Sequence, residues 1–220
     1  MKGYLRCAQW KLAHWRKPAA FQCDGVRHQC FAHGYNRTWK NERAVEIPLV
    51  MKVVRDCRAK RILEVGNVLS HYFNFPHDVL DKYEVGRGII QKDIVEFHPA
   101  GHYDLIVSVS TLEHVGWDET PRVPEKVIDA LRHMKSLLAP GGCMALTFPV
   151  NYNPFLDEFV RANTRDFGVV SYVKRITEDA EWQQVDAASA AACAYGKPYP
   201  FANAIAFSVF NNASPGAGVH

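Results

Sequence analysis

The sequence Arg-Ile-Leu-Glu-Val-Gly-Asn-Val-Leu-Ser, residues 61–70, predicts the architecture of the chain. Its short apolar run, interrupted by Glu64 and ended by Gly66, is typical of a central strand of a parallel sheet, buried on both faces. A carboxylate in such a strand costs free energy unless a partner pairs with it. Since ligands of open α/β sheets bind outside the carboxyl ends of the strands, we expect a ligand to be that partner. The alternative is a surface Glu on an edge strand, followed by an ordinary turn.

Four more short apolar segments follow this strand. Before the first strand a helix is expected, with Asn41 as its cap and a kink or a restart at Pro48. A second helix is expected over 123–138, where apolar residues recur at helical spacing until Pro140-Gly141-Gly142. Alternating strands and helices are the pattern of a doubly wound α/β sheet. The expected strands after the first lie at 77–83, 88–94, 103–110 and 143–150.

An acidic residue stands at the end of each of the first three expected strands. Asp81 follows Glu64 at about the roughly twenty-residue step that separates a first nucleotide-binding strand from an acid on the second. There it can accept hydrogen bonds from both ribose hydroxyls. Asp93 can accept a hydrogen bond from the exocyclic amine of adenine, while the neighbouring Ile94 packs on the ring. Together the three acids predict an adenosine-shaped site.

The turn after the first strand, residues 67–73, is expected to run into a helix. Backbone N–H groups at a helix start are unpaired and favour an anionic group of a ligand. Gly66 is the one glycine of this turn, which disfavours a dinucleotide, because close approach of the backbone to a pyrophosphate needs further glycines. No Gly-Lys-Ser/Thr follows, so a P-loop is excluded.

These segments resemble the class I S-adenosylmethionine (SAM)-dependent methyltransferases over residues 60–150, and weakly to about 210. The first motif has one glycine here, where the family usually has two or three. The resemblance is carried by Leu63-Glu64-Val65-Gly66, Asp81, Asp93, Tyr103-Asp104-Leu105-Ile106, Leu112-Glu113-His114-Val115 and Leu137-Leu138-Ala139-Pro140-Gly141-Gly142.

The resemblance implies a Rossmann-like sheet of seven strands, with an antiparallel last strand at 202–210, and SAM as the cofactor. It places the SAM-binding domain at 41–211, after an N-terminal extension or lid (1–40) and before a flexible tail (212–220). The residues expected to bind the cofactor are Glu64, Gly66, Asn67, Ser70, Asp81, Lys82, Asp93, Ile94 and Ser110.

The implied chemistry is methyl transfer from a sulfonium that is already activated, so the enzyme mainly positions the acceptor in line with the methyl group. A base helps where the acceptor is a hydroxyl. His114 is the first candidate, because an imidazole titrates near neutral pH, and Glu113 can orient a neighbouring group. Tyr152, after the fifth strand, can line the acceptor pocket. The alternatives are a His114 that packs near the cofactor or lies on the surface, and an ordinary loop at 151–153.

The implied function is transfer of a methyl group to an O or N atom of a small molecule, such as a sugar or a natural product. The Asp/Asn-Pro-Pro-Tyr/Phe signature of enzymes that methylate base amines is absent, because Ser110-Thr111-Leu112-Glu113 stands at its place. Two alternatives remain. One is a SAM- or nucleotide-binding subunit without catalysis, and the other is a different enzyme on the same fold, such as an aminopropyl transferase or a dehydrogenase. The oligomeric state stays open.

The composition of the 220-residue chain is that of an ordinary soluble globular protein, with 48% hydrophobic and 22% charged residues. A net charge of +3 and the lack of a Lys/Arg run argue against a nucleic-acid partner. No signal peptide and no stretch of membrane-spanning length is recognised, so we expect a cytoplasmic protein whose six cysteines are free thiols. Cys57 and Cys143 are expected to be small core residues.

The first forty residues are rich in aromatic side chains and histidines and show no clean helical period. We expect irregular structure there, as a lid over a pocket or as padding of the core, with a hairpin that turns at Asp24-Gly25. A local cluster of cysteines and histidines lacks the close pairs of a zinc site, which favours incidental residues of the hairpin and no metal. The cluster comprises Cys23, His28, Cys30 and His33.

Overall fold

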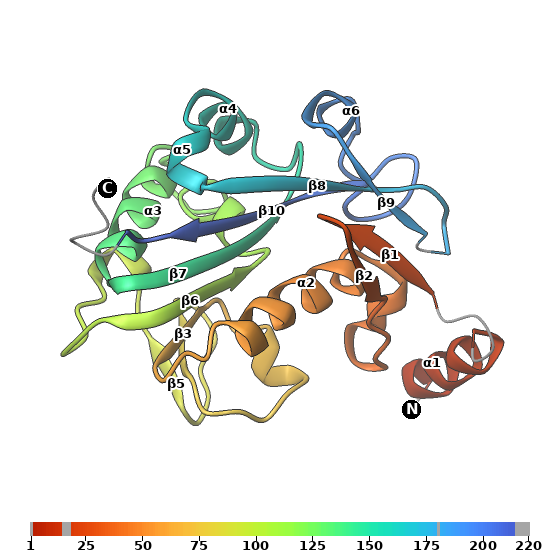
Figure 1. The fold of residues 1–220 in the computed structure, drawn as a ribbon, viewed down its shortest axis with the longest axis horizontal. Helices are drawn as coiled ribbons and strands as arrows, with labels where there is room; N and C mark the ends of the chain where they lie inside the picture. The colour runs from red at the N-terminus through yellow and green to blue at the C-terminus, as the bar shows by residue number, and fades with distance from the viewer. Residues whose placement is uncertain (1, 15–18, 180, 214–220) are drawn as a thin grey trace, which may run out of the picture. The chain divides into compact units, whose positions relative to one another are not determined.

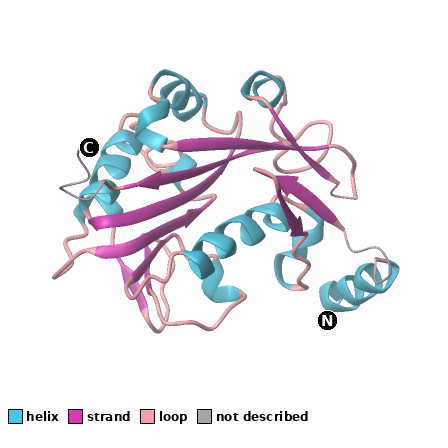
Figure 2. Cartoon of the chain, viewed as in Figure 1, coloured by secondary structure: helices cyan, strands magenta, loops and turns pink. Residues whose placement is uncertain are grey.

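The computed structural model describes residues 2–14, 19–179 and 181–213 of the chain. Figure 1 labels its helices and strands, and Figure 2 colours them by type. The strands are β1 (Ala20–Cys23), β2 (Val26–Gln29), β3 (Ile62–Val65), β4 (Asp78–Asp81), β5 (Ile89–Gln91), β6 (Tyr103–Val109), β7 (Leu138–Pro149), β8 (Val169–Arg175), β9 (Trp182–Val185) and β10 (Ala204–Asn211). The helices are α1 (Lys2–Ala13), α2 (Arg43–Asp56), α3 (Lys126–Ser136), α4 (Pro154–Ala162), α5 (Thr164–Phe167) and α6 (Ala187–Ala191).

Eight of the strands form one sheet in the order β5-β4-β3-β6-β7-β10-β8-β9, and β1 and β2 form a separate hairpin. β3 pairs in parallel with β4 on one side and with β6 on the other, and the pairs β4–β5 and β6–β7 are parallel as well. All four residues of β3 are buried, so the expectation of a central strand is confirmed. The strand order reverses beside β3, which is where ligands bind in open α/β sheets.

The last strand, β10, is antiparallel to the neighbouring strand β7. The Val150 N–H donates to the Ala204 carbonyl and the Asn212 N–H donates to the Gly142 carbonyl, so residue numbers along β10 rise as those along β7 fall. β8 and β9 also pair antiparallel. The doubly wound α/β class with an antiparallel last strand is therefore confirmed, and the sheet has eight strands rather than seven, because β9 extends it beyond β8.

Two crossovers of the parallel part are shorter than the usual helical ones. Residues 66–77, between β3 and β4, contain a single 3-10 turn, η2 (Leu69–His71), where the sequence predicts a helix. Residues 82–88, between β4 and β5, contain no helix. The helix predicted after Gly66 is thus a single 3-10 turn, and the amides of Val68 and Leu69 at its start donate to the Glu64 carboxylate.

The crossover between β6 and β7 is an α-helix, as expected. α3 ends at Ser136, and β7 begins at Leu138. Pro140-Gly141-Gly142, at which the helix was predicted to end, therefore lies within the strand. The pairing of β6 with β7 shifts register between Tyr103 and Leu105. The buried positions of α3 recur at the spacing of one helix face. They are Val127, Ala130, Leu131 and Met134.

The chain forms two compact units. The parallel-sheet unit comprises residues 53–148, 153–170 and the segment from 208 onward. The hairpin unit comprises the residues up to 52, together with 149–152 and 171–207. No helix of the described residues is both long enough and apolar enough for a membrane crossing. Of the predicted flexible tail, the part from 214 on lies outside the described residues.

The hairpin turns where the sequence predicts it. Asp24 and Gly25 have φ values of 51° and 74°, and a two-residue turn that follows the strand twist needs positive φ at both positions. The Asp24 carboxylate accepts hydrogen bonds from the Ser171 hydroxyl and from the Gln184 amide, each at 2.7 Å. The predicted hairpin is confirmed, and Cys23 lies at the end of its first strand.

The first forty residues also contain a regular helix, so the prediction of irregular structure at their start is wrong. α1 buries Cys7 in a cluster with Ala32 and Trp39, and the partly buried Trp10 packs against it. These partners come from other segments, so the apolar anchor of the helix is a tertiary contact that the local period does not reveal.

α2 begins where the sequence predicts it. The Oδ1 of Asn41 accepts a hydrogen bond from the Arg43 N–H at 3.1 Å, which satisfies one of the free amides of the first turn. The helix continues through Pro48 to Asp56, so it does not restart there.

Candidate active site

A cavity of about 320 Å³ lies in the parallel-sheet unit, at the carboxyl ends of β3, β4 and β5 and beside the segment that follows β6. Carboxyl ends of neighbouring parallel strands meet at one edge of the sheet, and this edge lies at the reversal of strand order. Six residues predicted from the sequence line the cavity: Gly66, Asp81, Lys82, Asp93, Ile94 and His114.

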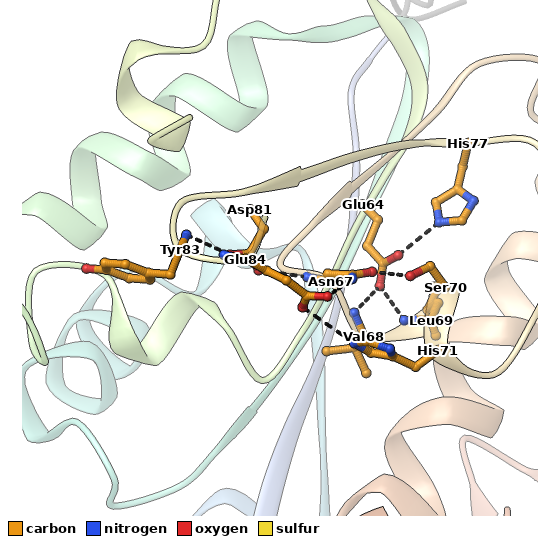
Figure 3. A network of polar contacts seen from close by, with 10 residues as sticks. All are labelled: Glu64, Asn67, Val68, Leu69, Ser70, His71, His77, Asp81, Tyr83 and Glu84. Atoms are coloured by element: carbon orange, nitrogen blue, oxygen red, sulfur yellow. Dashed lines mark hydrogen bonds and ion pairs between the residues drawn. The ribbon is translucent and has the colours of Figure 1, made fainter. Parts of the chain in front are cut away.

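Glu64 lies in β3 and is fully buried, and its partners are protein groups. One oxygen accepts hydrogen bonds from the Val68 N–H at 2.9 Å and from the Leu69 N–H, and the other contacts His77 Nε2 at 2.9 Å (Figure 3). Glu64 does not line the cavity, so the expectation that it faces a ligand is corrected. The anion at the turn amides is the carboxylate of the chain itself, which replaces an anionic ligand group there.

His77 completes this buried pair. Burial by itself would lower the pKa of His77, but hydrogen bonds to the Glu64 carboxylate and the Phe75 carbonyl, with the charges of Glu64 and Asp78, outweigh burial and raise it. The ring stacks on Phe75 with centroids 4.0 Å apart. The side chains of His77 and Glu64 therefore clamp the turn after β3 to the strand that it follows.

Asp81, at the end of β4, holds two turns at once. One oxygen accepts from the Asn67 N–H at 3.0 Å, and the other accepts from the N–H groups of Tyr83 and Glu84 at 2.8 and 2.7 Å. A carboxylate offers roughly four acceptor positions. Three are occupied, so the geometry leaves about one for a ligand hydroxyl, rather than the two that the sequence interpretation assigns to it.

Asn67 and Ser70 stabilise the same turn from outside the cavity wall. The Asn67 side-chain amide donates to Glu84 Oε1 at 2.7 Å, and the Ser70 hydroxyl donates to Asn67 Oδ1. Glu84 Oε2 lies 3.5 Å from His71 Nε2 (Figure 3). In this structure Asn67 and Ser70 organise the loop, and neither lines the cavity.

Gly66 is required by the approach of two chain segments. Its φ is +84°, and its N–H donates to the Leu80 carbonyl at 2.8 Å. A Cβ at this position would lie 2.0 Å from the Oγ1 of Thr111, which follows β6 and also lines the cavity. One glycine therefore lets the ends of β3 and β6 meet at the wall of the cavity.

Asp93, which lines the cavity, belongs to a network of four charges with Lys82, Lys126 and Glu119. Its Oδ2 contacts Lys126 Nζ at 2.5 Å and Lys82 Nζ at 3.0 Å, and its Oδ1 accepts from the Val95 N–H at 3.2 Å. Both ammonium groups also contact Glu119 Oε2, at 2.7 and 2.8 Å. Burial raises the pKa of Asp93, but the hydrogen bonds from the lysines outweigh burial and hold it below its usual range.

Glu119 and Lys126 were not among the residues predicted from the sequence. The pKa of Glu119 is also lowered, since the same two lysines outweigh its burial, and the Gly116 N–H donates to its Oε1 at 3.2 Å. For Lys82, burial would lower the pKa, and the carboxylates of Glu119 and Asp93 raise it instead. The sequence offers only a weak signal for Glu119, because a single acidic residue in a loop does not by itself indicate a site.

His114 follows β6 and lies between two carboxylates. Its Nδ1 contacts Asp118 Oδ2 at 2.5 Å, its Nε2 lies 3.5 Å from Glu113 Oε1, and its side chain is 45% exposed. Asp118 was not predicted, and it lines the cavity with His114. Glu113 is buried behind the wall, where its backbone carbonyl accepts from the Asn153 side chain at 2.9 Å.

Ser110 and Tyr152 are not among the residues that line this cavity. Ser110 is buried with a φ of 41°, and its N–H donates to the Thr147 carbonyl at 2.9 Å. Tyr152 belongs to the hairpin unit, where its ring meets the ring of Tyr195 edge-on, with centroids 4.9 Å apart. The amide of Asn151 donates to carbonyls of the same unit.

No family model matches the sequence, and no curated protein matches it. Solved structures do match in fold. The N-methyltransferase NodS from Bradyrhizobium japonicum WM9, in complex with S-adenosyl-L-homocysteine, is 15% identical, with a TM-score of 0.51 over 78% of this chain and 87% of that one. TehB from Haemophilus influenzae is 13% identical, with a TM-score of 0.44 over 82% and 65% of the two chains. The sugar N-methyltransferase KedS8 from Streptoalloteichus sp ATCC 53650 is 18% identical, with a TM-score of 0.40 over 71% and 66%.

The similarity to NodS concerns the arrangement of helices and strands, because the identity is low. It agrees with the parallel order of β3 to β7 and with the antiparallel β10, which the family resemblance of the sequence implies. The chain has the fold of the class I SAM-dependent methyltransferases.

Proposed function

We propose that the chain is a SAM-dependent methyltransferase and that the cavity beside β3, β4 and β5 holds the adenosyl part of SAM. The observation that carries this proposal is the meeting of Gly66, Asp81 and Asp93 with Ile94 around one cavity in this fold. Polar acceptors and an apolar wall together suit a nucleoside, and the strand-order reversal is the usual place for one.

The chain's own residues would bind and orient the cofactor, which supplies the activated methyl group. Asp81 has about one acceptor position left for a ribose hydroxyl, and Ile94 offers an apolar face to the adenine ring. Asp93, held by Lys82 and Lys126, is an ionised acceptor beside that face. These interactions fix the cofactor, and rate enhancement then comes mainly from alignment with the acceptor.

The acceptor in this proposal is an O or N atom of a small molecule, and His114 is the group that takes its proton. Asp118 contacts Nδ1, and we assign the proton transfer to Nε2, which lies 3.5 Å from Glu113 Oε1. A base oriented in this way contributes to transfer when the acceptor must lose a proton.

Replacing Asp81 by Ala is expected to weaken SAM binding about 5- to 150-fold, because one hydrogen bond between a charged acceptor and a hydroxyl is worth about 1–3 kcal/mol. Calorimetry on the folded variant measures this affinity, and circular dichroism checks that the fold persists. Asp78→Ala is the matched control, since Asp78 lies at the other end of β4, where its carboxylate accepts from the Tyr103 hydroxyl at 2.8 Å. Equal SAM affinity of Asp81→Ala and the native chain contradicts the assignment.

Replacing His114 by Ala is expected to lower turnover by roughly 10²- to 10⁴-fold, because it removes the base, while SAM affinity changes little, because the proposed acceptors for the cofactor are Asp81 and Asp93. The measurement is transfer of a labelled methyl group from SAM to a panel of small hydroxyl and amine acceptors. Asp118→Asn should give a smaller loss. If His114→Ala loses affinity and turnover equally, His114 contacts the cofactor instead.

The same experiments separate the alternatives. A SAM-binding subunit without catalysis should bind SAM in calorimetry and transfer no methyl group to any acceptor. A dehydrogenase should be stabilised against heat by NAD and not by SAM, because a ligand stabilises the folded state that binds it.

A further inference from the structure

Two cysteines far apart in the sequence lie side by side in the parallel-sheet unit. Cys57 follows α2, and its N–H donates to the Val53 carbonyl at 2.9 Å. Cys143 lies in β7, opposite Leu105 of β6. Their Sγ atoms are 3.1 Å apart, against roughly 2.0 Å in a disulfide bond. Small movements of the two side chains therefore separate a thiol pair from a covalent link.

The surroundings of this thiol pair assign different roles to its members. Cys143 is 7% exposed, whereas Cys57 is half-buried, so Cys57 is the more accessible residue of the pair. The Cys57 Sγ also lies 4.0 Å from the carbonyl oxygen of Asp104, at the start of β6. No group of three or more metal-binding side chains is found among the described residues, which disfavours a metal clip at the pair.

We propose that Cys57 and Cys143 form an oxidation site, at which a small-molecule disulfide such as glutathione disulfide converts the two thiols into an intramolecular disulfide. This inference does not rest on the proposed methyl transfer. It goes beyond the sequence interpretation, which treats both residues as core thiols.

The reaction balances in two exchange steps. Cys57 loses its proton to solvent, and its thiolate attacks one sulfur of glutathione disulfide, which releases the first glutathione and leaves a mixed disulfide. Cys143 then loses its proton and attacks the Cys57 sulfur, which releases the second glutathione. Two protein thiols are oxidised, and one glutathione disulfide is reduced to two thiols.

Burial is the main reason that the pKa of Cys143 is raised to about 12, and the hydrogen bond with Cys57 raises it further. A thiol of this kind is rarely ionised near neutral pH and reacts slowly with reagents in solution. Cys143 can still attack the mixed disulfide on Cys57, because the two sulfurs are neighbours and their effective concentration is high. Cys143 is therefore the resolving thiol, and Cys57 is the one that meets the oxidant.

The position of the pair predicts its effect. Residues 58–142, which the new bond would enclose, include every residue that lines the candidate cavity. The pair itself lies at the amino end of β6, at the edge of the sheet opposite to the cavity. A cross-link that closes a long loop restricts the unfolded chain. Oxidation is thus expected to stabilise the unit without a change at the cavity wall.

The test is equilibration of the intact chain in buffers with increasing ratios of glutathione disulfide to glutathione. The oxidised chain should lose the mass of two hydrogen atoms, and four of its six thiols should remain open to alkylation after unfolding. A peptide map without reductant should link the peptides of Cys57 and Cys143. The midpoint of thermal unfolding should rise by about 5–10 °C relative to the reduced chain.

Three variants control the interpretation. Cys57→Ser should abolish both the cross-link and the thermal shift, and Cys143→Ser should accumulate glutathione on Cys57. Cys193→Ser, which alters a half-buried cysteine of the hairpin unit, should behave like the native chain. A peptide map that shows stable glutathione on Cys57 of the native chain, a link between other cysteines, or no link at any ratio overturns the proposal. The map and Cys57→Ser keep the test decisive even if Cys143→Ser does not fold.

Discussion

Replacing Glu64 by Ala is expected to lower the free energy of unfolding by about 3–5 kcal/mol. The carboxylate is fully buried, and its removal leaves the His77 ring and the amides of Val68 and Leu69 without their acceptor. Buried groups that lose a charged partner are among the few causes of losses this large. Urea denaturation followed by circular dichroism measures the change.

Glu96→Ala is the matched control, because Glu96 is an exposed glutamate of the same unit and should change stability by no more than about 0.5 kcal/mol. Glu64→Gln should fall between the two, since it keeps an acceptor oxygen and loses the charge. A Glu64→Ala chain as stable as the Glu96→Ala chain contradicts the buried clamp.

The pH dependence of stability follows from the raised pKa of His77. A histidine with a raised pKa in the folded state binds its proton more tightly there, so its contribution is complete below the unfolded value of about 6.5. The contribution is lost as the pH rises through the higher folded value. As the pH rises from about 6.5 through the folded pKa of His77, the native chain should therefore lose more free energy of unfolding than Glu64→Ala. In that variant the carboxylate that raises the pKa of His77 is absent.

Replacing Gly66 by Ala is expected to destabilise the folded chain by about 2–4 kcal/mol and to weaken SAM binding by at least roughly tenfold. The new Cβ would lie 2.0 Å from Thr111 Oγ1, and the φ of +84° already disfavours any side chain. Gly66 and Thr111 both line the cavity, so any movement that separates the new Cβ from Thr111 also moves the cavity wall. Thermal unfolding and SAM calorimetry measure the two effects.

Gly88→Ala separates the two causes of this loss. Gly88 has nearly the same φ, +83°, but a Cβ there meets nothing within 4 Å. It should show only the backbone cost of about 1–2 kcal/mol, with unchanged SAM affinity. If Gly66→Ala behaves like Gly88→Ala, the close approach to Thr111 has no role at the cavity.

Much of the parallel sheet was predictable because its signals are local. β3, β4 and β6 are short apolar runs with a turn residue or an acid at the end, and such runs form buried strands wherever a sheet can cover them. α1 was not predictable, since Cys7 and Trp10 find their packing partners in a distant segment. The helix predicted after Gly66 is only one 3-10 turn, and its contact with Glu64 of the strand was not evident from the local pattern.

Local sequence was enough to predict that Gly66, Asp81 and Asp93 stand at the ends of successive parallel strands, because strand ends are set by local turn chemistry and by the length of each apolar run. The contacts that these residues and their neighbours make depend instead on the three-dimensional fold. His77 reaches Glu64 across 13 positions, Lys126 reaches Asp93 across 33, and Cys143 reaches Cys57 across 86. Such partners depend on sheet order and crossover length, and the pairing of charges and thiols follows from those long-range contacts rather than from spacing along the chain.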